Sequence, residues 1–404
     1  MFVGRDKELA SLEKLYQKEK FQMVVLYGRR RMGKTTLITR FIEGKPAIFF
    51  TAQEANDKLN LEEFSKKVYQ FFSIPETAGA FHNWNAAFDF LADRAKEKRF
   101  ILAFDEFPYA AYANRALASI LQNAIDHKFK DTGLYIILCG SQISFMENEV
   151  LGYKSPLFGR RTAQIKLEGL DYYDAARMLP GFSHVEQLQI YSCVGGTPHY
   201  LAQIDNEETF EENMERLFFD ISGYLYNEPM MLLQQELREP AMYNSIIRAI
   251  ASGANRNNEI SSRVGEMSST VNKYLRTLMD LHIVTKIYPF GEDPETSKKA
   301  IYRLADNCYL FWYRFVFPVR QEIESGNGDI VAHRILQGEC KWRNASPELS
   351  TIQKVMEKDY LMPEYKQFYH CFFSKTAYSE QAKAFEREEN ILLYDVDSFF
   401  QEGL

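Results

Sequence analysis

Two glycines, a lysine and two threonines near the start of the chain have the spacing of a loop that holds phosphate groups. The segment fits the pattern G-x-x-x-x-G-K-T, in which glycines let backbone N–H groups surround a phosphate. Its lysine reaches the β- and γ-phosphates of a nucleotide, and the hydroxyl of the next threonine ligates Mg²⁺. We therefore predict a site for ATP and Mg²⁺ built from Gly28, Arg29, Arg30, Arg31, Met32, Gly33, Lys34, Thr35 and Thr36.

The residues on both sides of this loop favour the prediction over a chance cluster of glycine and lysine. Residues 23–27 form an apolar run typical of a buried strand, and residues 36–44 have a helical pattern that ends at Gly44. The motif requires this context, because the N-terminus of the helix adds the positive end of its dipole.

Two neighbouring carboxylates follow a second apolar run at residues 101–104. Ligands bind at the carboxyl ends of strands in open α/β sheets. We therefore predict that Asp105 holds Mg²⁺ through water and that Glu106 polarises the attacking water. An ordinary acidic turn is the alternative, which the phosphate loop makes less favoured. Ser141 ends another apolar run and is placed to sense the γ-phosphate.

Arg160 and Arg161 follow Gly159 just before the last predicted strand of the sheet. An arginine in this place can stabilise the charge of the transition state, in its own subunit or in a neighbouring one. A solvated basic pair fits the same residues equally well. Both interpretations stay open.

These side chains need a scaffold that brings several strand ends together. Further strands are predicted at 46–52, 133–142 and 161–170, and helical stretches alternate with them. The alternation predicts an α/β fold in which helices cover both faces of a parallel sheet. With the phosphate loop, it predicts a P-loop nucleoside-triphosphatase core of ASCE type.

The composition is that of a globular protein with several domains. The chain has 404 residues and a net charge of −7. No apolar run is long enough to span a bilayer, so we expect a cytoplasmic protein with no membrane partner. The five cysteines are scattered, which predicts neither a disulfide framework nor a zinc site. We divide the chain into the P-loop core at 1–170, a helical lid at 171–236, a winged helix-turn-helix at 237–310 and a small α/β domain at 311–404.

Several segments in combination resemble a known family. FVGRDKEL, the phosphate loop, ILAFDEF, CGSQISFM, SPLFGRR and VGGTPHYL resemble, in this order, archaeal and bacterial P-loop ATPases of the AAA+/STAND-like group. The resemblance is to those members that carry a C-terminal DUF234 domain, and it covers nearly the whole chain. It implies an ATPase in which Gly4, Arg5 and the segment around Pro198 flank the adenine.

Residues 240–304 have the pattern of three helices followed by an extended hairpin, which is typical of a winged helix. The third helix would carry Asn272, Lys273 and Arg276 on one polar face. Nine basic and six acidic residues give this segment a charge of +3, which favours DNA only mildly. A module that binds a protein or regulates the ATPase fits as well. A homo-oligomer is a further expectation.

The end of the chain raises the question of a second active site. In a strand predicted over 334–342, Glu339 and Lys341 would share one face. A carboxylate beside a lysine suits metal-dependent phosphodiester cleavage. With Asp329 they resemble the D…E-x-K pattern of PD-(D/E)XK nucleases, which the DUF234 domain is thought to resemble. The first half of such a fold is missing ahead of this strand, so an edge strand with solvated side chains is the favoured interpretation.

The expected function is therefore ATP binding and hydrolysis. We expect it to drive a nucleotide-dependent switch whose winged helix binds DNA or a protein partner. The alternative is an ATP-regulated, DNA-processing nuclease that uses Asp329, Glu339 and Lys341.

Overall fold

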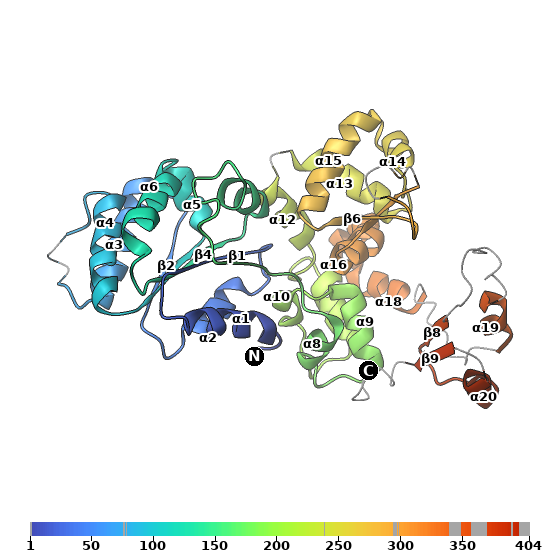
Figure 1. Ribbon diagram of the computed structural model, residues 1–404. Helices are drawn as coiled ribbons and strands as arrows, with labels where there is room; N and C mark the ends of the chain where they lie inside the picture. Colours follow the sequence, from blue (N-terminus) through green and yellow to red (C-terminus); the bar gives the residue numbers. More distant parts are fainter. Residues whose placement is uncertain are drawn as a thin grey trace.

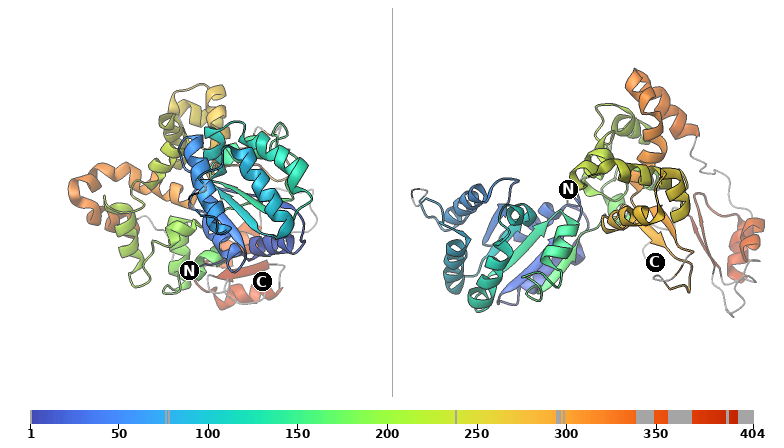
Figure 2. Two further views of the ribbon diagram at one scale, coloured as in Figure 1. Left: turned by 90° about the vertical axis from the view of Figure 1, so that its left-hand side faces the viewer. Right: turned by 90° about the horizontal axis from the view of Figure 1, so that it is seen from above.

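An N-terminal α/β half and a helical half lie beside each other along the molecule (Figure 1). The computed structural model describes residues 2–338 apart from 76, 78, 238, 294–296 and 298, together with 349–356, 370–388 and 391–395. A small group of helices and strands from the end of the chain lies beyond the helical half (Figure 2).

Five parallel strands form the central sheet in the order β2-β3-β4-β1-β5. Strand β4 lies between β1, which leads into the phosphate loop, and β3, which ends at the acidic pair. This is the order of the ASCE-type sheet that the sequence predicted. The strands are β1 (Gln22–Tyr27), β2 (Ala47–Thr51), β3 (Ile101–Asp105), β4 (Tyr135–Gly140) and β5 (Ala163–Lys166).

Helices cover both faces of this sheet, which explains why its strands are apolar throughout. Along β1, Met23 and Val25 pack into one hydrophobic core, whereas Val24 and Leu26 pack into another. Successive side chains of a strand point to opposite faces, so both faces are buried. The helical elements of this half are α1 (Asp6–Tyr16), α2 (Lys34–Ile42), α3 (Asp57–Phe71), α4 (Trp84–Glu97), α5 (Phe107–Ala113), α6 (Leu117–Ala124), η2 (Ile125–Phe129), α7 (Ile143–Phe145) and η3 (Met146–Val150).

One hydrophobic core joins the helical half from Leu170 to Leu336. This core includes buried residues on both sides of position 310, so it is continuous across the domain boundary predicted there. The elements are α8 (Tyr172–Arg177), α9 (His184–Val194), α10 (Pro198–Leu201), α11 (Phe210–Met214), η4 (Glu215–Phe219), α12 (Glu228–Glu236), α13 (Pro240–Ala251), α14 (Asn257–Val264), α15 (Ser268–Asp280), β6 (Val284–Ile287), β7 (Ile301–Leu304), α16 (Asn307–Phe311), η5 (Trp312–Val316), η6 (Phe317–Val319), α17 (Arg320–Glu322), η7 (Ile323–Asn327) and α18 (Gly328–Gly338).

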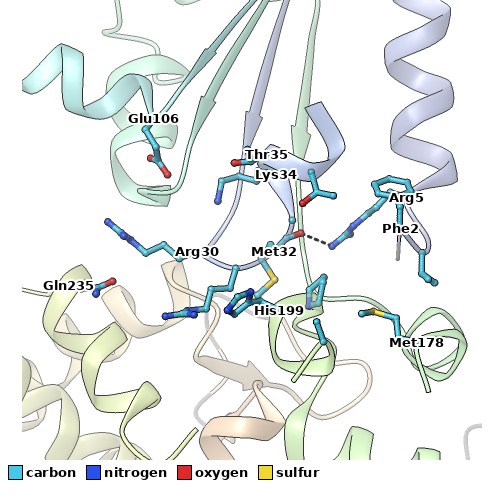
Figure 3. Close-up of a pocket in the computed structure, with 16 residues that line it drawn as sticks. Phe2, Arg5, Arg30, Met32, Lys34, Thr35, Glu106, Met178, His199 and Gln235 are labelled. Carbon is cyan, nitrogen blue, oxygen red and sulfur yellow. Dashed lines mark hydrogen bonds between the residues drawn. The ribbon is translucent and has the colours of Figure 1, made fainter. Parts of the chain in front are cut away.

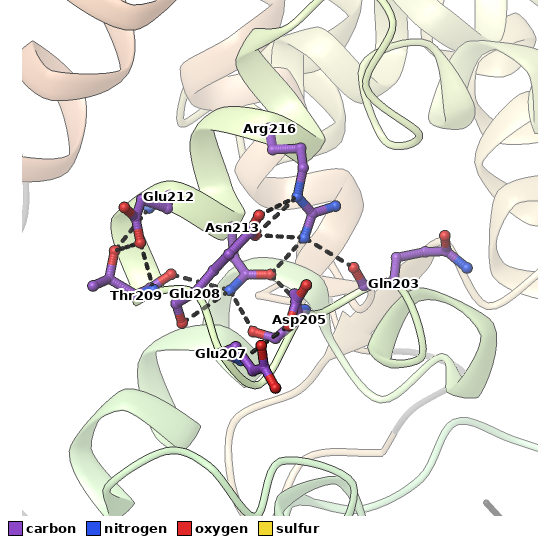
Figure 4. Close-up of polar contacts among 8 residues, drawn as sticks. All are labelled: Gln203, Asp205, Glu207, Glu208, Thr209, Glu212, Asn213 and Arg216. Carbon is purple, nitrogen blue, oxygen red and sulfur yellow. Dashed lines mark hydrogen bonds and ion pairs between the residues drawn. The ribbon is translucent and has the colours of Figure 1, made fainter.

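A polar network holds the turn between α10 and α11 (Figure 4). The fully buried amide of Asn213 donates to the backbone oxygens of Asp205 and Thr209 at 2.9 and 3.0 Å. Arg216 donates to the same amide at 2.8 Å and pairs with Glu208 at 2.8 Å. A buried amide costs free energy unless it is hydrogen-bonded, so these contacts fix the turn and with it the short helix α10.

Residues 240–304, named here the helix-hairpin module, contain the three helices and the hairpin that the sequence predicted. Helices α13, α14 and α15 precede β6, which pairs antiparallel with β7. Helix α15 buries Val271, Leu275 and Leu278. Lys273 and Arg276 are exposed on its other face, as amphipathic spacing requires.

The last described elements form a small α/β unit. Strands β8 (His370–Ser374) and β9 (Ile391–Asp395) pair in parallel, and α20 (Glu380–Glu388) connects them. Helix α19 (Leu349–Met356) joins their small core. No helix in the described part of the chain is long and apolar enough to cross a membrane.

The strand predicted over 334–342 is wrong for its described residues, because 334–338 are the last part of helix α18. Val331, Ala332, Ile335 and Leu336 recur with helical spacing and are buried in the core of the helical half. Glu339 and Lys341 lie outside the described residues, so the predicted strand geometry that pairs them is not observed.

Candidate nucleotide-binding site

The phosphate loop runs from the end of β1 to the start of α2 and needs both of its glycines. A Cβ on Gly28 would lie 2.3 Å from the carbonyl oxygen of Leu167, and Gly33 has a φ of 80°. The buried ammonium of Lys34 donates to the carbonyl oxygens of Gly28 and Arg29 at 2.8 and 2.9 Å. The Lys34 side chain is therefore folded back onto the phosphate loop, where its charge is predicted to bind the phosphates of a nucleotide.

The two predicted metal ligands are in direct contact. The hydroxyl of Thr35 donates to Oδ2 of Asp105 at 2.9 Å, and the side chain of Asp105 is buried. Hydroxyl and carboxylate oxygens are the donors that Mg²⁺ prefers, so the pair fits this ion. Burial and the neighbouring Asp105 raise the pKa of Cys139, which leaves a neutral thiol beside the carboxylate.

Glu106 is held by the residue that was predicted to sense the γ-phosphate. Its Oε2 accepts hydrogen bonds from the backbone nitrogen of Ser141 at 3.2 Å and from the hydroxyl of Ser141 at 2.9 Å. Glu106 itself has a φ of 50°, which is uncommon for a residue with a side chain. The structure thus brings Glu106 and Ser141 together at the ends of β3 and β4.

A pocket of about 500 Å³ lies against the phosphate loop (Figure 3). Phe2 and Met178 lie on one side of the loop, whereas Glu106 and Arg30 lie on the other. The apolar side suits a flat base, and the polar side suits phosphates. The pocket is lined by Phe2, Val3, Arg5, Arg30, Arg31, Met32, Gly33, Lys34, Thr35, Thr36, Glu106, Met178, Pro198, His199, Ala202 and Gln235.

The residues that the resemblance placed around the adenine lie at or beside this pocket. Arg5 and Pro198 line it. Gly4 packs behind the lining, where a Cβ would lie 2.5 Å from a carboxylate oxygen of Asp174. The guanidinium of Arg5 donates to the carbonyl oxygens of Met32 at 3.2 Å and Glu168 at 2.5 Å, so the start of the chain is attached to the phosphate loop.

Arg29 and Arg31 of the phosphate loop reach the helical half of the molecule. Arg29 donates to Oδ2 of Asp306 at 2.7 Å and lies 5.4 Å from the ring centroid of Tyr309. Arg31 pairs with Glu228 at 2.5 Å. Burial lowers the pKa of Arg29, but Asp306, Tyr309 and Tyr200 together outweigh burial and raise the pKa overall. The loop is therefore ion-paired to two segments that lie far from it in the sequence.

Arg160 makes contacts of a different kind from those predicted. Its Nε lies 3.0 Å from both carboxylate oxygens of Asp126, and its Nη1 donates to the backbone oxygen of Pro156 at 2.9 Å. The hydrogen bond from Arg160 is the main cause that lowers the pKa of Asp126 to about 2. Neither Arg160 nor Arg161 is among the described residues that line the pocket, so a role for them in their own site is not supported. A role at a neighbouring subunit stays a prediction.

Residues 2–204 match a family described as an ATPase domain found predominantly in Archaea. This chain belongs to that ATPase family. The ATPase is 32% identical over 330 residues to the uncharacterized protein MJECL04 of Methanocaldococcus jannaschii, which is 82% of this chain and 72% of the relative. A stretch of 45 residues is 51% identical to the uncharacterized ATP-binding protein MJ0423 of the same organism, covering 11% of this chain and 76% of that one.

The fold of the ATPase also matches a solved structure, the Walker-type ATPase PABY2304 of Pyrococcus abyssi. The TM-score is 0.61 at 21% identity, over 78% of this chain and 96% of that chain. At this identity the match supports the fold, a P-loop architecture in both proteins. The family match, which is to an ATPase domain, makes the protein an enzyme that binds and hydrolyses ATP.

The predicted nuclease residues are not assembled in the described part of this ATPase. Asp329 lies in the first turn of α18 rather than ahead of a strand, and it lines a second pocket with Glu212 and Asp220. Its partners in the D…E-x-K pattern, Glu339 and Lys341, are not described. The geometry therefore offers no support for the nuclease alternative.

Sequence reasoning missed the residues that come from distant segments. Glu228, Asp306 and Met178 belong to no motif, and only the folded chain brings them to the loop. A signal existed for the first two. Three consecutive arginines in a half-buried loop require acceptors, although the sequence does not say where these lie.

Proposed function

We propose that this ATPase is a nucleotide-dependent switch, in which ATP binding and hydrolysis at the phosphate loop change the placement of the helix-hairpin module. The contacts between the loop and the two ends of this module support the proposal. Glu228 starts α12, which leads into the module, and Asp306 follows β7, which ends it. Through Arg31 and Arg29, the phosphate loop is bonded to both connections.

These ion pairs respond to charge because they are largely removed from water. The side chains of Arg29 and Asp306 are 12% and 9% exposed, and that of Glu228 is 3% exposed. A nucleotide brings several negative charges to the same loop, and these charges compete with Asp306 and Glu228 for the guanidinium groups. Leaving one member of a buried pair without its partner costs about 3–5 kcal/mol, which is enough to shift a balance between two placements of the module.

Hydrolysis then follows from the side chains at the loop. Lys34 moves from the carbonyl oxygens to the β- and γ-phosphates, and Glu106 orients the attacking water. Thr35 and Asp105 are the residues that would hold Mg²⁺, whose charge helps to neutralise the phosphate oxygens. When the γ-phosphate leaves, the competition for the loop arginines weakens and the ion pairs re-form.

DNA is the partner that we propose for the module. Lys273 and Arg276 are exposed on α15, and the module carries a net charge of +3 in a chain whose total is −7. Basic side chains on one exposed helix face suit the phosphate backbone of a duplex.

The test of the proposed function is ATP turnover with and without duplex DNA, at several salt concentrations. We expect stimulation by DNA that weakens with salt and is reduced in a double variant, Lys273→Ala with Arg276→Ala. Lys34→Ala should abolish turnover under every condition. If DNA did not change the ATP turnover of the wild-type protein, DNA would be rejected as the partner. Full turnover in Lys34→Ala would reject the phosphate loop as the site of ATP hydrolysis.

A further inference from the structure

We propose that Arg30 supplies, from the phosphate loop itself, the positive charge that stabilises the transferring phosphate during ATP hydrolysis. This inference rests on the ATP-hydrolysing site described above. It assigns to a loop residue of the same subunit the role that the sequence suggested for Arg160 or Arg161.

The position of Arg30 in the pocket carries the argument. Arg30 lines the same pocket as Lys34, Thr35 and Glu106. Figure 3 shows its side chain on the side of the loop where Glu106 lies, across from Phe2 and Met178. The γ-phosphate must lie between Lys34 and Glu106, because Glu106 acts on the water that attacks it. Arg30 is therefore at the end of the pocket where the reaction takes place.

A contact to the helix that follows Glu106 orients the Arg30 side chain. Its Nη2 donates to the hydroxyl of Tyr109 at 2.6 Å, and Tyr109 lies in α5, which starts directly after Glu106. The guanidinium and the catalytic carboxylate are thus positioned by the same strand-to-helix turn. The Arg30 side chain is half-buried, so it can turn toward a phosphate without being pulled out of a packed core.

The other arginines near the loop are committed to different contacts. Among the described residues that line the pocket, Arg5 bonds backbone carbonyl oxygens on the Phe2 side and Arg31 is paired with Glu228. Arg29 is paired with Asp306, and Arg160 with Asp126. Arg30 is the arginine of this set that lies on the Glu106 side of the loop (Figure 3).

The chemistry needs a cation at this point. As the water oxygen forms its bond to the γ-phosphorus, the bond from phosphorus to the bridging oxygen breaks and negative charge collects on the departing ADP. Glu106 accepts hydrogen bonding from the water and receives its proton. Two parallel N–H donors of a guanidinium match phosphate oxygens in this geometry, whereas a lysine offers a point charge.

The first test compares Arg30→Ala and Arg30→Lys with Arg40→Ala, a control on α2 whose exposed side chain pairs with Glu43. We expect the kcat of Arg30→Ala to fall by about 100-fold or more, with little recovery in Arg30→Lys. Affinity for ADP should change by less than about 3-fold, since the effect belongs to the transition state. Binding of ADP with aluminium fluoride, which mimics the transferring phosphate, should be lost. ADP binding also shows that each variant is folded.

The second test asks whether the charge comes from the same subunit. Arg30→Ala, which keeps Lys34, is mixed with Lys34→Ala, which keeps Arg30. The inference predicts no recovery of turnover in the mixture. Recovery would show that the arginine acts on a neighbouring subunit and would overturn the proposal. A kcat close to that of the wild-type protein in Arg30→Ala would overturn it as well, and wild-type turnover that is lost in Lys34→Ala would leave the ATPase assignment intact.

Discussion

Arg29 and Asp306 are separated by 277 positions in the chain, yet their side chains meet at 2.7 Å. One belongs to the phosphate loop and the other caps the helix that follows the helix-hairpin module, where it also accepts a hydrogen bond from the backbone nitrogen of Tyr309 at 3.1 Å. In the proposed switch, nucleotide phosphates at the loop compete with Asp306 for this guanidinium. Because of this contact, we expect nucleotide binding and the placement of the helix-hairpin module to affect each other.

Asp306→Asn is predicted to strengthen nucleotide binding while it weakens the fold. The change keeps the shape of the side chain but removes the charge that competes with phosphate for Arg29. We expect ATP affinity to rise by about 5-fold or more, which is the usual scale of coupling between sites. The free energy of unfolding should fall by roughly 3–5 kcal/mol, because the buried Arg29 loses its charged partner. Nucleotide titration and urea unfolding measure the two effects.

The matched control for this variant is Glu43→Gln, which breaks the exposed pair with Arg40. Pairs of this kind contribute about 0–1 kcal/mol, so both measurements should stay near the wild-type values. If Asp306→Asn behaved like this control, the Arg29–Asp306 pair would have no part in nucleotide binding.

The contact between Thr35 and Asp105 predicts a specific change in the demand for Mg²⁺. Asp105→Asn removes the charged oxygen that accepts from the Thr35 hydroxyl. We expect the Mg²⁺ concentration for half-maximal turnover to rise by about 10-fold or more, as ligand changes of this kind typically do. Thr35→Ser keeps a hydroxyl and should keep turnover, whereas Thr35→Val should lose it. An unchanged Mg²⁺ requirement in Asp105→Asn would remove this residue from the metal site.

Ser141→Ala is predicted to lower turnover without weakening nucleotide binding. The hydroxyl of Ser141 is one of two groups of this residue that hold Glu106, and the backbone nitrogen remains after the substitution. With one donor left, Glu106 orients the attacking water less well, and we expect kcat to fall by about 10-fold at an unchanged KM. Steady-state phosphate release measures both. A higher kcat in Ser141→Ala would contradict this prediction and would mean that the Ser141 hydroxyl restrains Glu106.

The Arg160–Asp126 pair is predicted to stabilise the fold at neutral pH and to lose this effect at low pH. The pKa of Asp126 is about 2 in the fold, below its ordinary value of 3.8. A carboxyl whose pKa is lowered in the fold stabilises the protein fully when the pH is above the ordinary pKa of that carboxyl. This contribution is lost as the pH falls toward 2. The Tm values of the wild-type protein and of Asp126→Asn should therefore differ most near pH 6, and this difference should shrink below pH 4. A difference that did not change with pH would show that the pair is not charged in this way.

The local parts of the site were predictable, whereas the contacts between distant segments were not. Gly28 to Thr36 lie in one continuous motif, and Asp105 ends an apolar run, so their places in the sheet follow from pattern alone. Glu228 and Asp306 carry no such pattern. They become part of the site because the helical half folds against the loop.

The error at α18 has a similar physical cause. Gly326 forms a turn, with a φ of 86°, and the residues from 334 onward were predicted as a strand. The chain resumes a helix directly after that turn, because Val331 and Ile335 are buried by the core of the helical half. Tertiary packing decided the structure where the local signal favoured a break.

In the proposed switch, the nucleotide state of the phosphate loop reaches the helix-hairpin module through Arg29 and Arg31. Hydrogen–deuterium exchange of residues 240–304 tests it most directly, with ADP or a non-hydrolysable ATP analogue bound. The proposed switch predicts different exchange rates of residues 240–304 in the two nucleotide states of the wild-type protein. It also predicts that the difference disappears in a double variant, Glu228→Gln with Asp306→Asn, which still binds both nucleotides. Identical exchange with the two nucleotides in the wild-type protein would contradict it.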